Sequence, residues 1–314
     1  MRMRSFFRPW PLVLALAVLA GGAWYGLPAQ VAPWLVAANR HSAGLSAAVV
    51  DTGTHRVHYL QRGSGPVVVL LHGIFAEKDH WVDFARAFPE GYRLVIPDLP
   101  GFGQTGRDPA RPYDYAAQMA YLQAFLDALD VQQAHIAGSS MGATLGALLA
   151  LHAPQRVRSL AFIGAPHGLR TAQGSDMDRA IDAGRAPLVP QDAAQFEAML
   201  GLVFAQRPFL PYSVRAQAQA QALAQAASNQ QVWEAQLRDR FLLDGVLGRL
   251  QTPLLALWGG QDRVFHVSGA ARLRELLPAA QLQVLEEVGH LPMMEAPASS
   301  AQAYAAFLAL QPQP

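Results

Sequence analysis

The stretch HIAGSSMGATLG, His135–Gly146, places two adjacent serines between two glycines. It contains the pattern G-x-S-x-G, in which Gly138 and Gly142 flank Ser140. In this pattern the middle serine lies on a sharp strand-to-helix turn, and the glycines let the strand and the helix approach each other closely. Because the pattern is short and Gly/Ser pairs are common in ordinary turns, a nucleophilic role for Ser140 needs support from the rest of the chain.

Length and composition limit the classes of protein to which the chain can belong. Its 314 residues suggest one large domain or a domain with an insertion. Charged residues make up 15% and the formal net charge is +1, so the chain lacks the basic surface expected for nucleic-acid binding. The absence of cysteine excludes thiolate nucleophiles, cysteine-based zinc sites and disulfides. Any nucleophile must therefore be another type of residue.

The N-terminus has the pattern of an export signal or a membrane anchor. Three arginines within the first eight residues precede an uncharged stretch of 18 residues, Trp10 to Leu27. This length is near the minimum for a membrane span and favours an uncleaved anchor, although small residues near Gly22 and Ala29 also suit signal-peptidase cleavage. We therefore expect residues 1–28 to be an anchor or a signal peptide, with the arginines cytoplasmic and the remainder facing the periplasm or exterior.

Beyond a proline-punctuated connector at residues 29–44, apolar runs alternate with helical patterns. Two strands joined at Thr52–Gly53 are expected first, and the continuous apolar run at Pro66–Gly73 is typical of a strand covered on both faces. Strands alternating with helices predict a mostly parallel sheet, here eight-stranded, with helices on both faces. Further strands are expected at 93–98, 134–139, 158–164, 253–259 and 281–287, and helices at 79–88, 115–129, 140–152 and 267–277.

A long segment interrupts this alternation after the sixth strand. Residues 165–250 are rich in Ala and Gln, which are strong helix formers, and we expect them to form a helical cap on a core made of residues 45–164 and 251–314. The cap could overhang the C-terminal edge of the sheet, where open α/β folds bind ligands. Its apolar residues either line a substrate pocket or only pack the cap on the core: Phe196, Met199, Leu200, Val203, Phe204, Phe209 and Leu210.

A nucleophilic serine needs a base, because a hydroxyl is scarcely ionised at neutral pH. His290 follows the last predicted strand, and Asp262 follows the strand before it. A carboxylate beside the imidazole would fix its tautomer and stabilise its charged form. A surface histidine and a structural turn aspartate are the alternatives, and only the combination of the three residues favours a catalytic role.

A serine nucleophile also requires main-chain donors for the tetrahedral oxyanion, worth roughly 10²–10³ in rate apiece. The N–H of Met141, directly after the turn, is one candidate. The second is the N–H of Ile74, in the turn after the apolar strand that ends near His72. We expect His72 itself to be structural and to bond loop backbone.

Two further motifs suggest other chemistries. Asp51-Thr52-Gly53 matches the signature of aspartic proteases, but their chemistry needs two carboxylates and no second copy of the motif occurs in the sequence. Gly101–Gly106 matches the dinucleotide fingerprint G-x-G-x-x-G, yet Pro109 and Pro112 prevent it from opening into a helix. We interpret the first motif as a hairpin turn and the second as a loop.

The ordered motifs HGIFAEKDHW, VIPDLPGFGQT, GSSMGATLG, WGGQDRV and VGHLPMMEAP resemble those of the α/β-hydrolase superfamily from about Leu45 onward. The resemblance is greatest to bacterial lipase/esterases and to membrane-anchored monoacylglycerol lipases, which combine an N-terminal anchor, HG-x-x-x-x-KD-x-W and a helical cap. It implies an α/β-hydrolase fold. Ser140, Asp262 and His290 also occur in the chain order typical of that family's triad.

The resemblance further implies hydrolysis of carboxylic esters, with Ile74 and Met141 as oxyanion donors and with no metal or cofactor. Ala143 departs from the second glycine that relatives often carry, but alanine still allows close helix packing. Ser140 in place of aspartate argues against epoxide hydrolases and dehalogenases. The loop HGIFAEKD lacks the glycine-rich oxyanion loop that is usual in relatives that cleave C–C bonds.

The expected partners are a small acyl ester, such as a monoacylglycerol or a medium-chain ester, and a membrane through the N-terminal helix. Nucleic acid is not an expected partner. Alternatives that the sequence leaves open are a serine hydrolase of C–C or amide bonds, an acyltransferase, and a ligand-binding homologue with an idle triad. The sequence also leaves open the acyl-chain length, the oligomeric state and cleavage of the N-terminal segment.

Overall fold

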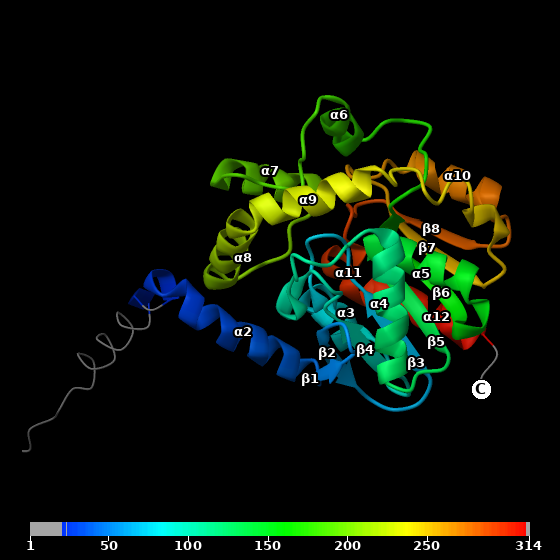
Figure 1. Ribbon diagram of the computed structural model, residues 1–314, viewed down its shortest axis with the longest axis horizontal. Helices are drawn as coiled ribbons and strands as arrows, with labels where there is room; N and C mark the ends of the chain where they lie inside the picture. The colour runs from blue at the N-terminus through cyan, green and yellow to red at the C-terminus, as the bar shows by residue number, and fades with distance from the viewer. Residues whose placement is uncertain (1–20, 23, 312–314) are drawn as a thin grey trace, which may run out of the picture.

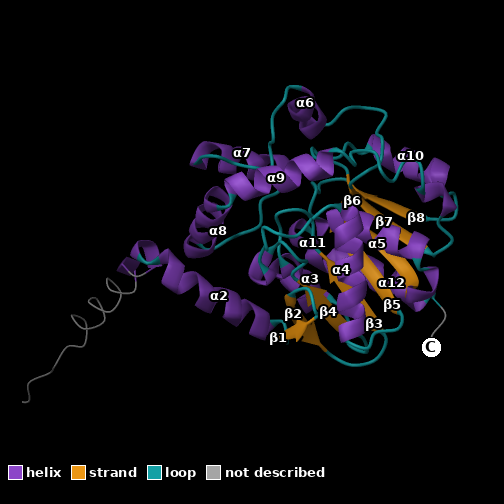
Figure 2. Cartoon of the chain, in the orientation of Figure 1, coloured by secondary structure: helices purple, strands orange, loops and turns teal. Residues whose placement is uncertain are grey.

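An eight-stranded, mostly parallel sheet forms the centre of the protein (Figure 2). The computed structural model describes residues 21–22 and 24–311. The strand order is β1-β2-β4-β3-β5-β6-β7-β8; β2 runs antiparallel to both neighbours and the other pairs are parallel. The strands are β1 (Ser46–Asp51), β2 (Arg56–Arg62), β3 (Val67–Leu71), β4 (Arg93–Pro97), β5 (Ala134–Ser140), β6 (Val157–Pro166), β7 (Leu254–Gly259) and β8 (Gln281–Leu285). The predicted eight-stranded α/β sheet is confirmed.

Helices cover both faces of the sheet (Figure 1). Successive side chains of β3 point to opposite faces, as the pleat of a strand requires. Val69 and Leu71 join one hydrophobic cluster, and Val68 and Leu70 join the other, which explains the continuous apolar run. The first cluster includes α4 (Tyr115–Ala128), α5 (Met141–His152) and α10 (Ser268–Leu276), and the second includes α3 (Val82–Ala87), α11 (Pro292–Glu295) and α12 (Pro297–Ala309).

The segment between β6 and β7 forms a helical layer beside the sheet (Figure 1). Its helices are α6 (Asp176–Asp182), α7 (Ala193–Val203), α8 (Tyr212–Ala224) and α9 (Ala226–Leu237). The Ala/Gln-rich stretch is helical in α8 and α9, as its composition predicts. Helix α6 starts with a capping box in which Ser175 and Asp178 satisfy each other's main-chain N–H groups.

The predicted connector is a helix, α2 (Pro28–Ser42). Pro28 occupies its first turn, where the missing N–H costs nothing. Arg40 Nε donates to Asp79 Oδ1 at 2.6 Å and so ties α2 to the loop after β3. Within residues 21–22 and 24–311 no helix is both long and apolar enough to cross a membrane. Most of the expected span, from Trp10 to Leu27, lies outside the described residues.

Both motifs that suggested other chemistries lie in turns. Gly53 N donates to the Asp51 carboxylate at 2.7 Å within the turn that joins β1 to β2. The Gly101–Gly106 segment contains a short 3₁₀ turn at Gly103–Thr105 and does not lead into a dinucleotide-binding helix. The structural interpretations of these two motifs therefore agree with the observed fold.

A buried ion pair joins the loops after β3 and β4. Lys78 Nζ lies 2.6 Å from Asp98 Oδ2, and the two side chains are 1% and 0% exposed. Asp98 also accepts the N–H of Lys78 at 2.8 Å and that of Gln104 at 2.8 Å. Because the loop after β3 carries Ile74, this pair fixes the main chain next to Ser140.

We expect the substitution Lys78→Met to lower the free energy of unfolding by about 3–5 kcal/mol, since it leaves the Asp98 carboxylate buried without its cation. Urea denaturation followed by circular dichroism measures the change. Arg111→Ala, which breaks the exposed pair with Asp108, is the control and should cost at most about 1 kcal/mol. Equal losses for the two variants would contradict the special role of the buried pair.

Candidate active site

Ser140 lies at the junction between β5 and α5, on a turn that only small neighbours permit. Its backbone has φ 54° and ψ −118°, a left-handed conformation that is strained for a residue with a side chain. A Cβ atom on Gly142 would lie 2.3 Å from the carbonyl oxygen of Leu71, and one on Gly138 would lie 2.3 Å from the main chain of Gly142. Both glycines are therefore needed for the close approach of α5 to β3 and β5.

Asp262 and His290 meet in the loops that follow β7 and β8. His290 Nδ1 lies 2.8 Å from Asp262 Oδ2, and both residues are 4% exposed. The other oxygen of Asp262 accepts the N–H groups of Val264 at 2.8 Å and Phe265 at 2.9 Å. The carboxylate is thus fixed in position and orients the imidazole ring.

Ser140 and His290 line the same cavity, together with Ile74. Within the described residues the Ser140 hydroxyl has no hydrogen-bond partner. Hydrogen bonds between a nucleophile and its base are often long without substrate and shorten in the reacting complex. The structure thus joins Asp262 to His290 directly and brings the serine to the same cavity.

The two expected oxyanion donors both lie beside the serine. Met141 is the first residue of α5, where N–H groups lack partners within the helix. Gly73, directly before Ile74, is so close that a Cβ atom on it would lie 3.2 Å from Ser140 Cβ. The main chain at positions 74 and 141 is therefore adjacent to the nucleophile from two sides.

His72 is a structural residue, as expected. Its Nδ1 donates to the carbonyl of Gly73 at 2.7 Å, and its Nε2 accepts the N–H of Leu99 at 2.9 Å. The ring is fully buried, and this burial lowers the pKa of His72 to about 4. A neutral ring with both nitrogens bonded to backbone connects the loops after β3 and β4 and cannot serve as the base.

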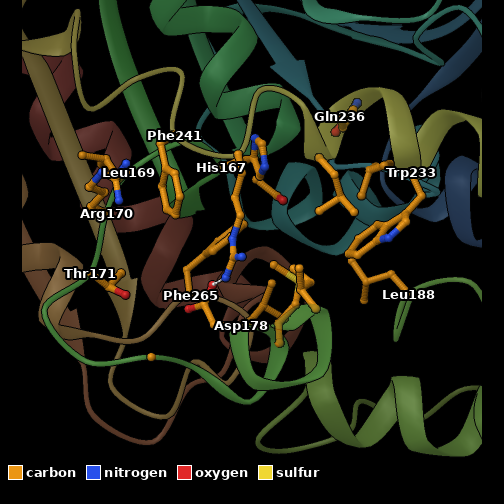
Figure 3. Close-up of a pocket in the computed structure, with 18 of the residues that line it drawn as sticks. His167, Leu169, Arg170, Thr171, Asp178, Leu188, Trp233, Gln236, Phe241 and Phe265 are labelled. Carbon is orange, nitrogen blue, oxygen red and sulfur yellow. Dashed lines mark hydrogen bonds and ion pairs between the residues drawn. The ribbon is translucent and has the colours of Figure 1, made fainter. Parts of the chain in front are cut away.

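Two cavities open from Ser140. One, of about 260 Å³, lies between the cap and the chain after β6, and it includes polar residues such as His167, Asp178 and Gln236 (Figure 3). The other, of about 240 Å³, lies against α7 and α8 and is called the apolar cavity below for its phenylalanine, methionine and leucine side chains, although Glu77 and Asn229 also line it. Its lining includes most of the cap residues that the sequence predicted: Phe196, Met199, Leu200, Val203, Phe204 and Leu210.

The prediction for Phe209 is wrong. Its side chain is 89% exposed and it is not among the residues that line either cavity. Phe209 lies in the irregular segment between α7 and α8, where no helical period fixes the direction of a side chain. Leu210, the next residue, lines the apolar cavity instead.

Sequence reasoning missed the polar residues of these cavities other than Ser140 and His290, and His167 and Glu77 are two examples. His167 directly follows β6 and lines the polar cavity, so its position after a strand was the available signal. Glu77 lines the apolar cavity, and burial raises the pKa of its carboxyl to about 7. No sequence motif distinguishes Glu77 from an ordinary loop carboxylate.

Comparison with known proteins identifies the family of this chain. Residues 66–297 match the alpha/beta hydrolase fold family. Lipase 1 of Psychrobacter immobilis is 29% identical over 79% of each chain, and monoacylglycerol lipase abhd6-B of Xenopus laevis is 28% identical over 86% of this chain and 84% of its own. A solved structure described as a membrane phospholipase A is 37% identical and superposes with a TM-score of 0.87 over 96% of this chain and 97% of its own. The chain belongs to the α/β-hydrolase family.

Proposed function

We propose that this protein is a serine hydrolase of carboxylic esters, in which Ser140 is the nucleophile, His290 the base and Asp262 the orienting carboxylate. The observation that carries the proposal is the 2.8 Å hydrogen bond between Asp262 and His290 at a cavity that also contains Ser140 on a strained turn. Lipases are among its relatives in sequence, and they span most of its length.

In this mechanism His290 Nε2 accepts the Ser140 hydroxyl proton while Oγ attacks the acyl carbonyl carbon. The N–H groups of Ile74 and Met141 stabilise the negative charge that develops on the carbonyl oxygen. His290 then donates the proton to the alcohol oxygen as the C–O bond breaks, which leaves an acyl group on Ser140. A water molecule, deprotonated by His290, attacks this acyl-enzyme and releases the acid.

The substrate that we propose is a monoacylglycerol or a medium-chain acyl ester. Support comes from the apolar cavity beside Ser140, whose lining includes Phe196, Met199 and Phe204. Some of the relatives are described as monoacylglycerol lipases. Residues 165–250 would act as the cap that encloses the acyl chain.

We further propose that the N-terminal segment anchors the protein in a membrane and that the catalytic part faces the periplasm or exterior. The basic N-terminus and the uncharged stretch from Trp10 to Leu27 support this arrangement. A similar solved structure is described as a membrane phospholipase A. An anchor would keep the cap close to amphiphilic substrates.

Ser140→Ala should abolish hydrolysis of p-nitrophenyl acyl esters and labelling by a fluorophosphonate probe, because it removes the attacking oxygen. Circular dichroism should show a folded protein. Ser139→Ala is the matched control: the neighbouring hydroxyl is buried and has no hydrogen-bond partner within the described residues, so labelling should persist. Turnover by the Ser140 variant, or labelling that depends on Ser139, would move the nucleophile elsewhere.

Asp262→Asn should lower kcat by on the order of 10³–10⁴-fold without unfolding the protein. The amide oxygen can still accept the N–H groups of Val264 and Phe265. Its NH₂ group, however, cannot accept the proton of His290 Nδ1, so the ring would adopt the tautomer that cannot take a proton from Ser140. Single-turnover kinetics should locate the loss in acylation, and an unchanged kcat would remove Asp262 from the mechanism.

Met199→Trp should shift the preference toward shorter acyl chains, because the larger side chain fills part of the apolar cavity. We expect kcat/KM for a p-nitrophenyl decanoate to fall about tenfold relative to that for the butyrate. Phe209→Ala is the control, since its exposed ring should leave the chain-length profile unchanged. An identical profile for the Met199 variant would mean that the acyl chain lies elsewhere.

A further inference from the structure

Ser140 lies where the two cavities meet, and Ile74 and Leu188 also line both of them. An ester extends in two directions from its carbonyl carbon, along the acyl chain and along the alcohol. A nucleophile at the junction of two cavities can therefore receive one part of the substrate in each.

Both cavities have many apolar residues, and they differ in their charged and hydrogen-bonding side chains. Phenylalanine, methionine and leucine side chains of the cap line the cavity that contains Met199, and its polar residues include Glu77, Arg215 and Asn229. The other cavity contains His167, Thr171 and Gln236, together with two arginines and two aspartates (Figure 3). Since hydroxyl groups need hydrogen-bond partners when they are buried, a hydroxylated alcohol fits the second cavity better than an alkyl chain does.

The charges of this polar cavity are balanced. Arg240 donates to Asp178 at 2.6 Å and to Asp182 at 2.8 Å, so its charge is neutralised by carboxylates of α6. Arg170 stacks on the ring of Phe241 with its guanidinium carbon 3.8 Å from the ring centroid. Two arginines against two aspartates favour an uncharged polar ligand over an anion.

His167 supplies a hydrogen-bonding group in this cavity. Its Nδ1 lies 2.9 Å from the hydroxyl of Tyr115, which is 3% exposed. The Thr144 side chain also forms a hydrogen bond with this hydroxyl. Burial lowers the pKa of His167 to about 4, so the ring is neutral and its Nε2 atom can either donate or accept a hydrogen bond, as a hydroxyl group can.

The Nε2 atom of His167 has no hydrogen-bond partner within residues 21–22 and 24–311. The backbone around the ring is fixed, because Thr144 Oγ1 donates to the carbonyl of His167 at 2.7 Å. On the other side, the ring of Phe265 lies 5.9 Å from His167 and 5.3 Å from His290, centroid to centroid. The polar cavity therefore starts next to the residue that would protonate the departing alcohol.

We propose that this cavity binds the alcohol part of the ester, an uncharged polyol such as glycerol, and that His167 Nε2 forms a hydrogen bond with one of its hydroxyls. The inference rests on the proposed ester hydrolysis and adds the class of alcohol and the residue that selects it. His167 is a specificity residue and not a second base: the carboxylate of Asp262 is bonded to His290, whereas His167 is held by a phenol.

The test compares two esters of the same acid, 1-monodecanoylglycerol and methyl decanoate. Both give the same acyl-enzyme, so the ratio of their kcat/KM values depends only on the alcohol. In His167→Leu the glycerol ester should lose about 3- to 10-fold more kcat/KM than the methyl ester, which is the worth of one neutral hydrogen bond. Tyr115→Phe should lower the ratio in the same direction, because the imidazole ring loses the partner of its Nδ1 atom and is no longer held toward the alcohol.

Two controls make the ratio specific. His167→Gln retains an N–H donor and should restore part of the preference for the glycerol ester. Met199→Trp should change the dependence on acyl-chain length equally for both alcohols. Both kcat/KM values of a ratio are measured on one preparation, so a partial loss of folded protein affects them equally and leaves the ratio unchanged. If His167→Leu does not fold, the ratio for Tyr115→Phe tests the proposal.

Equal losses on both esters in His167→Leu and Tyr115→Phe would reduce His167 to a structural residue and overturn the proposal. A changed acyl-chain profile with an unchanged alcohol ratio would reverse the assignment of the two cavities and overturn it as well. Failure of the proposed function has a different signature: the wild-type protein would hydrolyse neither ester, or its activity would survive Ser140→Ala.

Discussion

Close packing between the start of α5 and the ends of β3 and β5 is the constraint on which the site depends. Helix α5 approaches β3 so closely that Gly142 has no room for a Cβ atom beside the carbonyl of Leu71. Ser140, the last residue before the helix, then adopts a positive φ that a less tightly packed chain would relax. The fully buried strand β5 on one side and a helix with nine buried residues on the other hold the chain in this strained conformation. The fold thus fixes Ser140, which is 6% exposed, at the end of a buried strand.

The loops around Ser140 are rigid because buried polar groups connect them. His72 and Asp98 join the loops after β3 and β4, and each satisfies main-chain N–H groups as well as its own partners. Asp262 does the same for the loop after β7. Such groups are costly to bury and costly to disrupt, so each loop has one favoured conformation. Main-chain donors and side chains can then converge on one point although they come from distant parts of the sequence.

The sheet and the location of the site could be predicted from the sequence because parallel strands end at one edge, where Asp262, His290 and the turn at Ser140 all lie. The direction of cap side chains was less predictable. In α7 a helical period constrains Phe196 and Met199, whereas the irregular segment after α7 gives no such constraint, and there Phe209 points to solvent. His167 follows β6 just as Asp262 follows β7, but only the structure reveals the phenol of Tyr115 beside its Nδ1 atom.

Hydrogen bonds connect the cap directly to the loop that carries His290. The N–H of His290 donates to the carbonyl of Val203 at the end of α7. The carboxylate of Glu295 accepts N–H groups from the cap, at Ala205 and Gln206, and from the histidine loop, at Gly289. A displacement of α7 must therefore either move His290 or break several hydrogen bonds to a charged group, which are stronger than neutral ones. Because the same helix lines the apolar cavity, filling that cavity with an acyl chain acts directly on the element that holds His290. In the proposed reaction the acyl chain and His290 would therefore both contact α7, the first through its side chains and the second through the carbonyl of Val203.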